Sequence, residues 1–130
     1  MKLLLDTQML ILLMTDRRQL ANSEDAAIKD AEDLIVSTLS LMELRIKARA
    51  ERRRGLTPSI PLPVDAVAFC EGHRIVVHPL APADTIVTLE DDPPHGDPFD
   101  ELLLAHAQAL QAKLLTRDNK LVRHPLAYQP

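Results

Sequence analysis

Cysteine and aromatic residues are scarce in this chain of 130 residues. Cys70 is the only cysteine, so no disulfide can form within the chain, which is compatible with a reducing cytosol. We expect Cys70 to be a small apolar residue of the core. The aromatic residues are Phe69, Phe99 and Tyr128. Stacking of bases on aromatic side chains is therefore not expected to be the main mode of any RNA binding.

Apolar runs long enough to span a membrane are also absent. The first segment, MKLLLDTQMLILLMT, is rich in apolar side chains, but Asp6, Thr7 and Gln8 interrupt it. No small-residue cleavage site follows, so the segment does not fit the pattern of a signal peptide, and it is too short for a transmembrane helix. We expect a buried strand that leads into a helix, in a cytoplasmic protein that does not bind membranes.

Positive charge is in deficit, because the net charge is −4 at pH 7, which argues against a general nucleic-acid binder. Hydrophobic residues make up 46% and charged residues 26%, as in soluble globular proteins, and the length suits a single domain over residues 1–130. Six of the fifteen basic residues lie in RIKARAERRR, residues 45–54. Such a run is most often a solvated helix face, and it becomes a candidate phosphate-binding strip only beside a nuclease site.

Short apolar runs alternate with helix-like segments along the chain. The runs predict buried strands at 2–5, 34–37, 74–78 and 113–116. The segments between them predict helices at 9–20, 40–54, 64–71, 83–90 and 98–112, and a further helix that is capped by Asn22 or Ser23 and runs to about residue 33. This alternation predicts an α/β protein, a three-layer α/β/α sandwich with a mainly parallel central sheet of four or five strands. The tail, residues 123–130, is predicted as a short edge strand or a frayed end.

Acidic residues fall where the predicted strands end. Asp6 follows the first strand directly, Glu43 lies in the first turn after the second, and Asp118 lies two residues past the fourth. Asp100 lies in the first turn of the helix that leads back into the fourth strand, so it belongs at the same rim. Because open parallel sheets bind ligands outside the carboxyl ends of their strands, these side chains are expected to converge.

The helical phase separates Asp100 from its neighbour Glu101. Asp100 shares a face with Leu103, Leu104 and Ala107, so it is expected at the edge of the buried face, aimed at the rim. Glu101 is rotated by about 100° and is expected to face solvent.

Helix capping is the simpler explanation for two of these acids. Ser40 and Glu43 match a capping box, and Asp97 before Pro98 resembles the same device with Asp100. Either acid alone is better explained as a cap. The joint pattern favours a metal site, because clustered carboxylates repel one another without a cation, and oxygen ligands select Mg²⁺ or Mn²⁺ over zinc. No His/Cys pair has metal-ligand spacing. We expect the following histidines in loops or at the surface: His95, His106 and His124.

Four segments resemble successive motifs of PIN-domain ribonucleases, and most closely the VapC-like toxins of type II toxin–antitoxin pairs. They are LLLDTQMLILL, VSTLSLMELRIK, DPFDELLLAHA and LLTRD, and together they cover nearly the whole chain in order. The resemblance implies that the catalytic acids are the family's quartet, Asp6, Glu43, Asp100 and Asp118. It implies that Asp6, Asp100 and Asp118 are direct or water-mediated metal ligands, whereas Glu43 ligates a second metal or orients the attacking water.

Further residues have secondary roles by the same resemblance. Thr116 matches a residue that often bonds the site acids, and Asp97 matches an acid common in the DPFD subgroup. The chain departs from the subgroup at Gln8, Met42 and Glu101, where histidine, tryptophan and arginine are usual. None of these departures removes an acid of the quartet.

The implied activity is hydrolysis of RNA phosphodiester bonds by an endoribonuclease that depends on Mg²⁺ or Mn²⁺. Position and charge suggest arginines of the basic segment as contacts for RNA: Arg45, Arg49, Arg52 and Arg53. Family membership implies a homodimer and a cognate antitoxin protein as partner. Two other function classes remain: a non-catalytic PIN-like module that binds RNA or protein, and a phospho-acceptor receiver domain. The receiver domain would want paired acids after the first strand, where only Asp6 stands.

Overall fold

The centre of the molecule is a four-stranded parallel sheet. The computed structural model describes residues 1–130, and its strands are β1 (Lys2–Leu5), β2 (Asp33–Ser37), β3 (Val76–His78) and β4 (Ala112–Leu115). Their order is β3-β2-β1-β4, and every neighbouring pair is parallel. The tail adds only an isolated parallel bridge between Ala127 and Leu114, so it is neither a full edge strand nor frayed. The predicted sheet is confirmed with four strands.

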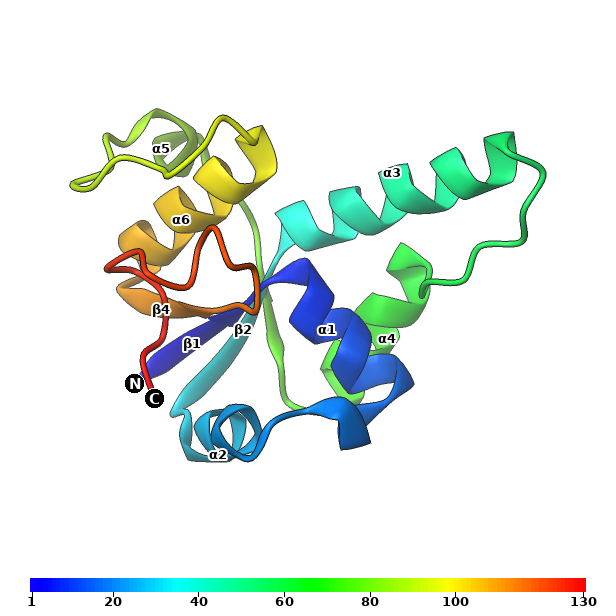
Figure 1. Cartoon of the computed structure of the whole chain (residues 1–130), viewed down its shortest axis with the longest axis horizontal. Helices are drawn as coiled ribbons and strands as arrows, with labels where there is room; N and C mark the ends of the chain where they lie inside the picture. The colour runs from blue at the N-terminus through cyan, green and yellow to red at the C-terminus, as the bar shows by residue number, and fades with distance from the viewer.

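Helices cover both faces of this sheet. They are α1 (Thr7–Thr15), α2 (Asn22–Asp30), α3 (Thr38–Arg53), α4 (Pro63–Gly72), α5 (Pro82–Ile86) and α6 (Pro98–Leu110). Figure 1 shows α1, α2 and α4 on one side and α5 with α6 on the other, while α3 runs outward from the end of β2. The three-layer α/β/α sandwich is therefore confirmed. None of the helices is both long and apolar enough to cross a membrane.

The two cores follow from the alternation of side chains along the central strands. Leu3 and Leu5 of β1 pack into the core beneath α1, α2 and α4, whereas Leu4 packs into the core beneath α6. All three leucines are fully buried, and each contributes about 2–3 kcal/mol through loss of apolar surface from water. Cys70 is fully buried in the first core, as expected.

The predicted starts of α1 and α3 are wrong by two residues, because their caps lie earlier in the chain than expected. Helix α1 begins at Thr7, since the Asp6 carboxylate accepts a hydrogen bond from the Met9 amide. Helix α3 begins at Thr38, since the Ser37 hydroxyl accepts one from the Leu39 amide. Asp6 directly follows β1, and Ser37 is the last residue of β2. In both cases the strand and the helix therefore join without a loop.

Several predicted helices also end too late. Helix α1 stops at Thr15 rather than residue 20, because Asp16 leaves the helical conformation and a short 3₁₀ turn, Arg17–Gln19, follows. Helix α2 stops at Asp30 rather than residue 33, before the chain enters β2, and its cap is Ala21 rather than Asn22 or Ser23. Helix α5 stops at Ile86 rather than residue 90, because the Gln108 amide bonds the backbone of Thr88 and Glu90 and holds that segment against α6.

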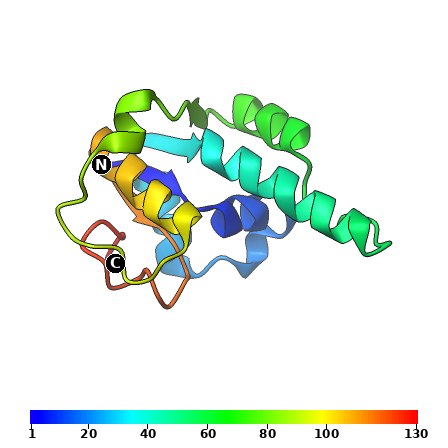
Figure 2. The same ribbon diagram turned by 90° about the horizontal axis from the view of Figure 1, so that it is seen from above.

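The carboxyl ends of the parallel strands meet at one edge. Helices α1 and α3 start there, and the N-terminus of α6 lies above it, as the second view shows (Figure 2). The strand order also differs from the order 2-1-3-4-5 of receiver domains, so that fold is excluded. The acidic side chains at this edge are therefore placed by these three helix starts and by the turn that follows β4.

A left-handed residue ends α6 directly before β4. Gln111 has φ 55° and ψ 41°, a conformation that favours glycine, and the helix stops at Leu110 rather than residue 112.

We predict that Gln111→Gly raises the free energy of unfolding by about 0.5–1 kcal/mol in urea denaturation, because glycine relieves backbone strain and the side chain that is lost is exposed. Gln111→Ala is the control and should bring no gain. Equal effects of the two variants would contradict the strain argument.

Candidate metal centre

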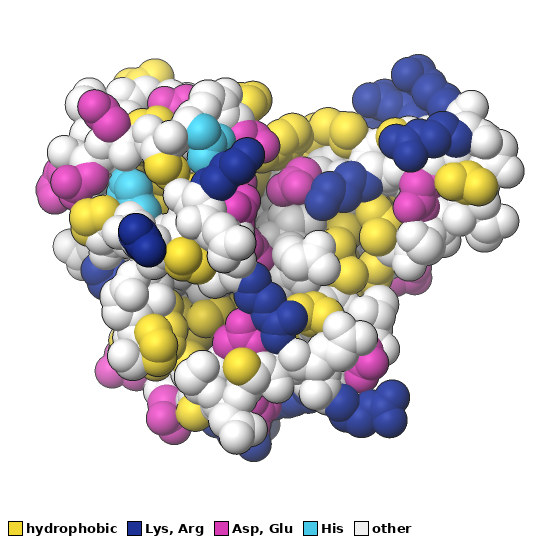
Figure 3. Space-filling model, in the orientation of Figure 1, with side chains coloured by type: hydrophobic (Ala, Val, Ile, Leu, Met, Phe, Trp, Pro, Cys, Tyr) yellow, Lys and Arg dark blue, Asp and Glu magenta, His cyan; other side chains and the backbone are white.

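A cleft of about 370 Å³ opens at the carboxyl edge of the sheet. It is lined by Asp6, Thr7, Gln8, Glu43, Lys47, Asp97, Asp100, Leu103, Arg117 and Asp118. All four predicted acids of the quartet are in this list, although the chain between the first and last of them spans most of the protein. In Figure 3 acidic side chains gather in the hollow between α6 and α3. The predicted convergence on one rim is therefore what the fold produces.

Asp6 is the most buried acid of the cleft, with 8% of its surface exposed. One carboxylate oxygen accepts the Met9 amide at 2.8 Å, so the side chain caps α1 as well as facing the cleft. Burial raises the pKa of Asp6 above its ordinary value, and the charges of Glu43 and Asp118 raise it further. Hydrogen bonds from the Thr116 hydroxyl and the Met9 amide act in the opposite direction.

Glu43 is held in place by side chains from two helices. The Thr7 hydroxyl donates to Glu43 Oε1 at 2.7 Å and accepts from the Ser40 hydroxyl at 2.9 Å, because a carboxylate can only accept. Lys47 Nζ lies 3.3 Å from Glu43 Oε2, one helical turn away. The capping box expected for Ser40 and Glu43 is wrong, since Ser37 caps the helix and Ser40 lies inside it. Glu43 is thereby turned toward the cleft.

Asp118 follows β4 in a tight turn. Its amide donates to the Thr116 hydroxyl oxygen at 3.0 Å, and its Oδ1 accepts from the Lys120 amide at 2.9 Å. Thr116 also bonds Asp6, so one threonine contacts two members of the quartet. This geometry fits the supporting role that we expected for Thr116.

The start of α6 separates Asp97 from Asp100. Asp97 caps the helix by accepting the amides of Phe99 at 2.9 Å and Asp100 at 3.4 Å. The Asp100 carboxylate does not return this bond, and its Oδ2 instead lies 3.0 Å from His95 Nε2. Burial, together with the charges of Asp97, Asp118 and Glu43, raises the pKa of Asp100 to about 6, whereas His95 acts to lower it.

Negative charge exceeds positive charge in the cleft. Five carboxylates line it, but the only cationic side chains there are Lys47 and Arg117. Arg117 is already paired, because its guanidinium contacts Glu24 at 2.6 and 2.8 Å and the Gln19 carbonyl at 2.5 Å. Burial is the main cause of the raised pKa values of Asp6 and Asp100, and this uncompensated charge raises them further.

The donor atoms suit a divalent cation. Carboxylate oxygens dominate the cleft, and ligand-type atoms of His95, Asp100 and Asp118 lie within 4.8 Å of one another. Oxygen donors of this kind favour hard cations such as Mg²⁺ and Mn²⁺. The residues present therefore fit a metal centre of the type expected from the sequence.

Three residues that line the cleft, and one that lies beside it, were missed by reasoning from the sequence. Thr7 and Lys47 could have been found, since they neighbour Asp6 in the chain and Glu43 on the helix, respectively. Arg117 is placed by a contact with α2 that no local pattern reveals. His95 was expected to be a loop or surface residue, and it does lie in a loop, but its ring contacts Asp100.

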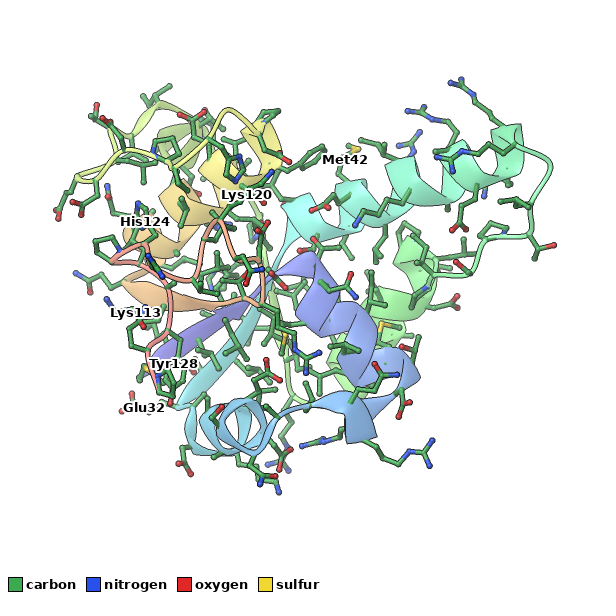
Figure 4. The ribbon with its side chains drawn as sticks, in the orientation of Figure 1. Glu32, Met42, Lys113, Lys120, His124 and Tyr128 are labelled. Atoms are coloured by element: carbon green, nitrogen blue, oxygen red, sulfur yellow. The ribbon has the colours of Figure 1, made fainter.

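The other two histidines lie away from the cleft. His106 is fully buried in α6 and pairs with the Ser37 hydroxyl at 2.8 Å, so its expected surface position is wrong; its spacing of three from Leu103 places it on the sheet-facing side. His124 lies in the C-terminal loop, on the opposite side of the molecule from α3, and contacts the Asp91 carbonyl (Figure 4). Neither has a place in the metal centre.

The remaining sequence expectations concern exposed side chains. Glu101 is exposed and lines a separate cleft between α5 and α6, as its helical phase predicted. The arginines expected to bind RNA are all exposed, but none lines the acidic cleft. Arg45 and Arg52 lie about 160–180° around α3 from Glu43, whereas Arg53 lies about 80° from it. Lys47 is the basic residue of α3 that reaches the cleft.

Comparisons with known proteins agree with this architecture. The sequence profile of the PIN domain matches residues 3–125. The fold is similar to that of a chain in the crystal structure of VapBC2 from Rickettsia felis bound to a DNA fragment from their promoter, with a TM-score of 0.61 and 16% identity over 98% of this chain and 96% of that chain. No curated protein sequence matches this chain. The family match spans nearly the whole sequence and includes every residue of the acidic cleft, and the chain therefore belongs to the PIN domain family.

Proposed function

We propose that this protein is a metal-dependent endoribonuclease that hydrolyses RNA phosphodiester bonds, and that it is the toxin of a toxin–antitoxin pair. The observation that carries the proposal is the meeting of four carboxylates in one cleft with too little positive charge to balance them. Membership of the PIN domain family supports nuclease activity. The arrangement is costly for stability unless a cation or a substrate uses it, so a functional role explains it better than capping alone.

The proposed cation ligands are Asp6, Asp100 and Asp118, with Mg²⁺ or Mn²⁺ as the cation. When bound, such an ion lowers the pKa of a water molecule and stabilises negative charge on the leaving oxygen. The contribution of the chain is to hold the carboxylates in position, since Asp6 is fixed by the Met9 amide and Asp118 by the backbone of Lys120. Asp97 caps α6 and also lines the cleft, so a direct part in cation binding stays a proposal for that residue.

Glu43 has a different environment from the other three acids. It stands on α3, on the opposite wall from α6, and its oxygens are occupied by Thr7 and Lys47. We assign it to a second cation or to the orientation of the attacking water. Lys47 is placed to meet a phosphate that enters along α3, because its ammonium lies at the cleft beside Glu43, whereas Arg117 is paired with Glu24.

The proposed role as a toxin brings proposed partners with it. The similar structure from Rickettsia felis is described as VapBC2 bound to promoter DNA, and that description concerns the other protein. By analogy we propose a cognate antitoxin as protein partner, a homodimer as the oligomeric state and the cytoplasm as the location. RNA is the proposed substrate, with the exposed arginines of α3 as contacts beyond the cleavage site.

The acidic cleft yields a prediction for cleavage. Asp6→Asn and Asp100→Asn should each reduce Mg²⁺- or Mn²⁺-dependent RNA cleavage by roughly a hundredfold or more, because each removes a charge at the reacting centre. Cleavage is measured on end-labelled RNA with purified protein. Glu101→Gln is the matched control, since it removes an adjacent charge that faces the other cleft, and it should keep its activity. Equal activity in wild type and both variants would favour a non-catalytic binding module.

The raised pKa of Asp100 yields a prediction for stability. A carboxyl whose folded-state pKa is about 6 rather than 3.8 binds its proton more tightly when folded, so stability is lost as the pH rises from 4 through 6. Without metal, Asp100→Asn should therefore be more stable than the wild type at pH 7.5, by about 2 kcal/mol, and should lose the advantage near pH 4. Added Mg²⁺ should raise the melting temperature of the wild type more than that of the variant.

Thermal unfolding followed by circular dichroism checks this difference. The matched control is Asp33→Asn, at the opposite end of the sheet, which should show neither the pH-dependent gain nor a changed response to Mg²⁺. If Asp100→Asn were destabilised equally at pH 4 and pH 7.5, the carboxylate would not be under electrostatic strain.

The arginines of α3 yield a third prediction. Arg49→Glu and Arg53→Glu should each weaken RNA cleavage several-fold at physiological salt, and the loss should shrink as salt is raised, because phosphate contacts are screened. Lys2→Glu, at the far end of β1, makes the same change of charge and should have little effect. We would abandon the proposed RNA strip if all three variants cleaved RNA like the wild type.

A further inference from the structure

His95 is the one imidazole beside the acidic cleft. It lies in the loop before α6, its side chain is 21% exposed, and Nε2 is 3.0 Å from Asp100 Oδ2. An oxygen of Asp118 is also within 4.8 Å of a ring nitrogen. An imidazole at this place has two possible roles toward a cation. It can be a ligand through Nε2, or it can hold a ligand carboxylate through an N–H at the same atom.

The backbone decides between the two roles by fixing the tautomer. The Asp97 amide donates a hydrogen bond to His95 Nδ1 at 3.1 Å. An amide can only donate, so Nδ1 must carry a lone pair and no proton. In a neutral imidazole the proton then lies on Nε2, which turns that atom into a donor rather than a metal ligand. The donor of this bond belongs to the residue that caps α6, so the start of the helix itself sets the tautomer.

The proton on Nε2 needs an acceptor. The atom is buried and has no well-aligned hydrogen-bond partner, although Asp100 Oδ2 lies at hydrogen-bonding distance. A buried donor without a partner costs about 1–3 kcal/mol, so a small rotation of the Asp100 carboxylate toward the ring is favoured. That rotation commits Oδ2 to His95 and leaves Oδ1 for the cleft.

We propose that His95 is a positioning residue of the metal centre, which donates from Nε2 to Asp100 and directs the other oxygen of that carboxylate to the cation. The inference rests on the proposed function, since it assumes a cation in the acidic cleft. It adds that the cation site consists of oxygen ligands although a histidine stands beside it. A site of this kind selects Mg²⁺ or Mn²⁺ and gives zinc no nitrogen ligand. Partners that orient a ligand in this way typically contribute 10- to 100-fold in metal affinity.

The tautomer is measurable without any cation. In protein labelled with ¹⁵N at histidine, the long-range ¹H–¹⁵N correlations of His95 should show the proton on Nε2, and saturating Mg²⁺ should leave it there. His95→Ala identifies the signal by its loss. A proton on Nδ1, or its transfer to Nδ1 when Mg²⁺ binds, would leave Nε2 without a proton to donate to Asp100 and would overturn the proposal.

Cation affinity separates positioning from ligation. Mn²⁺ binding is measured by electron paramagnetic resonance for the wild type, His95→Gln and His95→Ala, with circular dichroism to confirm that each variant is folded. The glutamine amide can place an N–H near the position of Nε2, so His95→Gln should bind Mn²⁺ within about threefold of the wild type, whereas His95→Ala should bind about 10- to 100-fold more weakly. Pulsed measurements on the wild type should show no coupling to a directly bound imidazole nitrogen.

The possible results separate the role of His95 from the existence of the metal centre. Equal affinities for all three proteins, or equal losses in both variants, or a bound imidazole nitrogen, would overturn the role of His95 and leave the acidic centre standing. If the wild type bound no Mn²⁺, the metal centre itself would fall and the positioning role with it.

Discussion

Mutual repulsion among carboxylates is the main physical constraint on the carboxyl edge of the sheet. A parallel sheet ends all its strands at one edge, and here α1 and α6 each begin with an acid above that edge, while α3 carries Glu43 in its second turn. Burial and neighbouring charge raise the pKa values of Asp6 and Asp100, which shows that the folded chain holds negative charge where water screens it poorly. The apolar layers on both sides of β1 supply the stability that this arrangement costs.

Hydrogen-bond donors and a few cationic side chains stabilise the carboxylates at this edge. Thr7 and Lys47 hold Glu43, Thr116 links Asp6 with Asp118, and the Asp97 amide sets the tautomer of His95. These contacts still leave the cleft with more negative than positive charge. They fix where each oxygen points, which is what a cation site requires of its surroundings. The cleft is thus ordered before any cation arrives, and the proposed function follows from that order.

The sequence predicted the strands and the acidic rim well for a physical reason. A short apolar run covered on both faces carries its own signal, and parallel connection then forces the strand ends together. The helix boundaries were less well predicted, because caps and stops depend on distant partners. Ser37 rather than Ser40 caps α3, and Gln108 from α6 determines where the segment after α5 becomes extended. Local pattern could not reveal either choice.

By itself the sequence determined the class of fold, the four acids that meet in one cleft and the separation of Asp100 from Glu101, because helical phase and strand alternation are properties of the local chain. Only the tertiary structure decided which groups face those acids. His95 approaches Asp100 through a loop, Arg117 is drawn to Glu24 on α2, and the arginines of α3 are turned away from the cleft wall that Lys47 occupies. Such contacts join segments far apart in the chain, and their geometry exists only once the layers have packed.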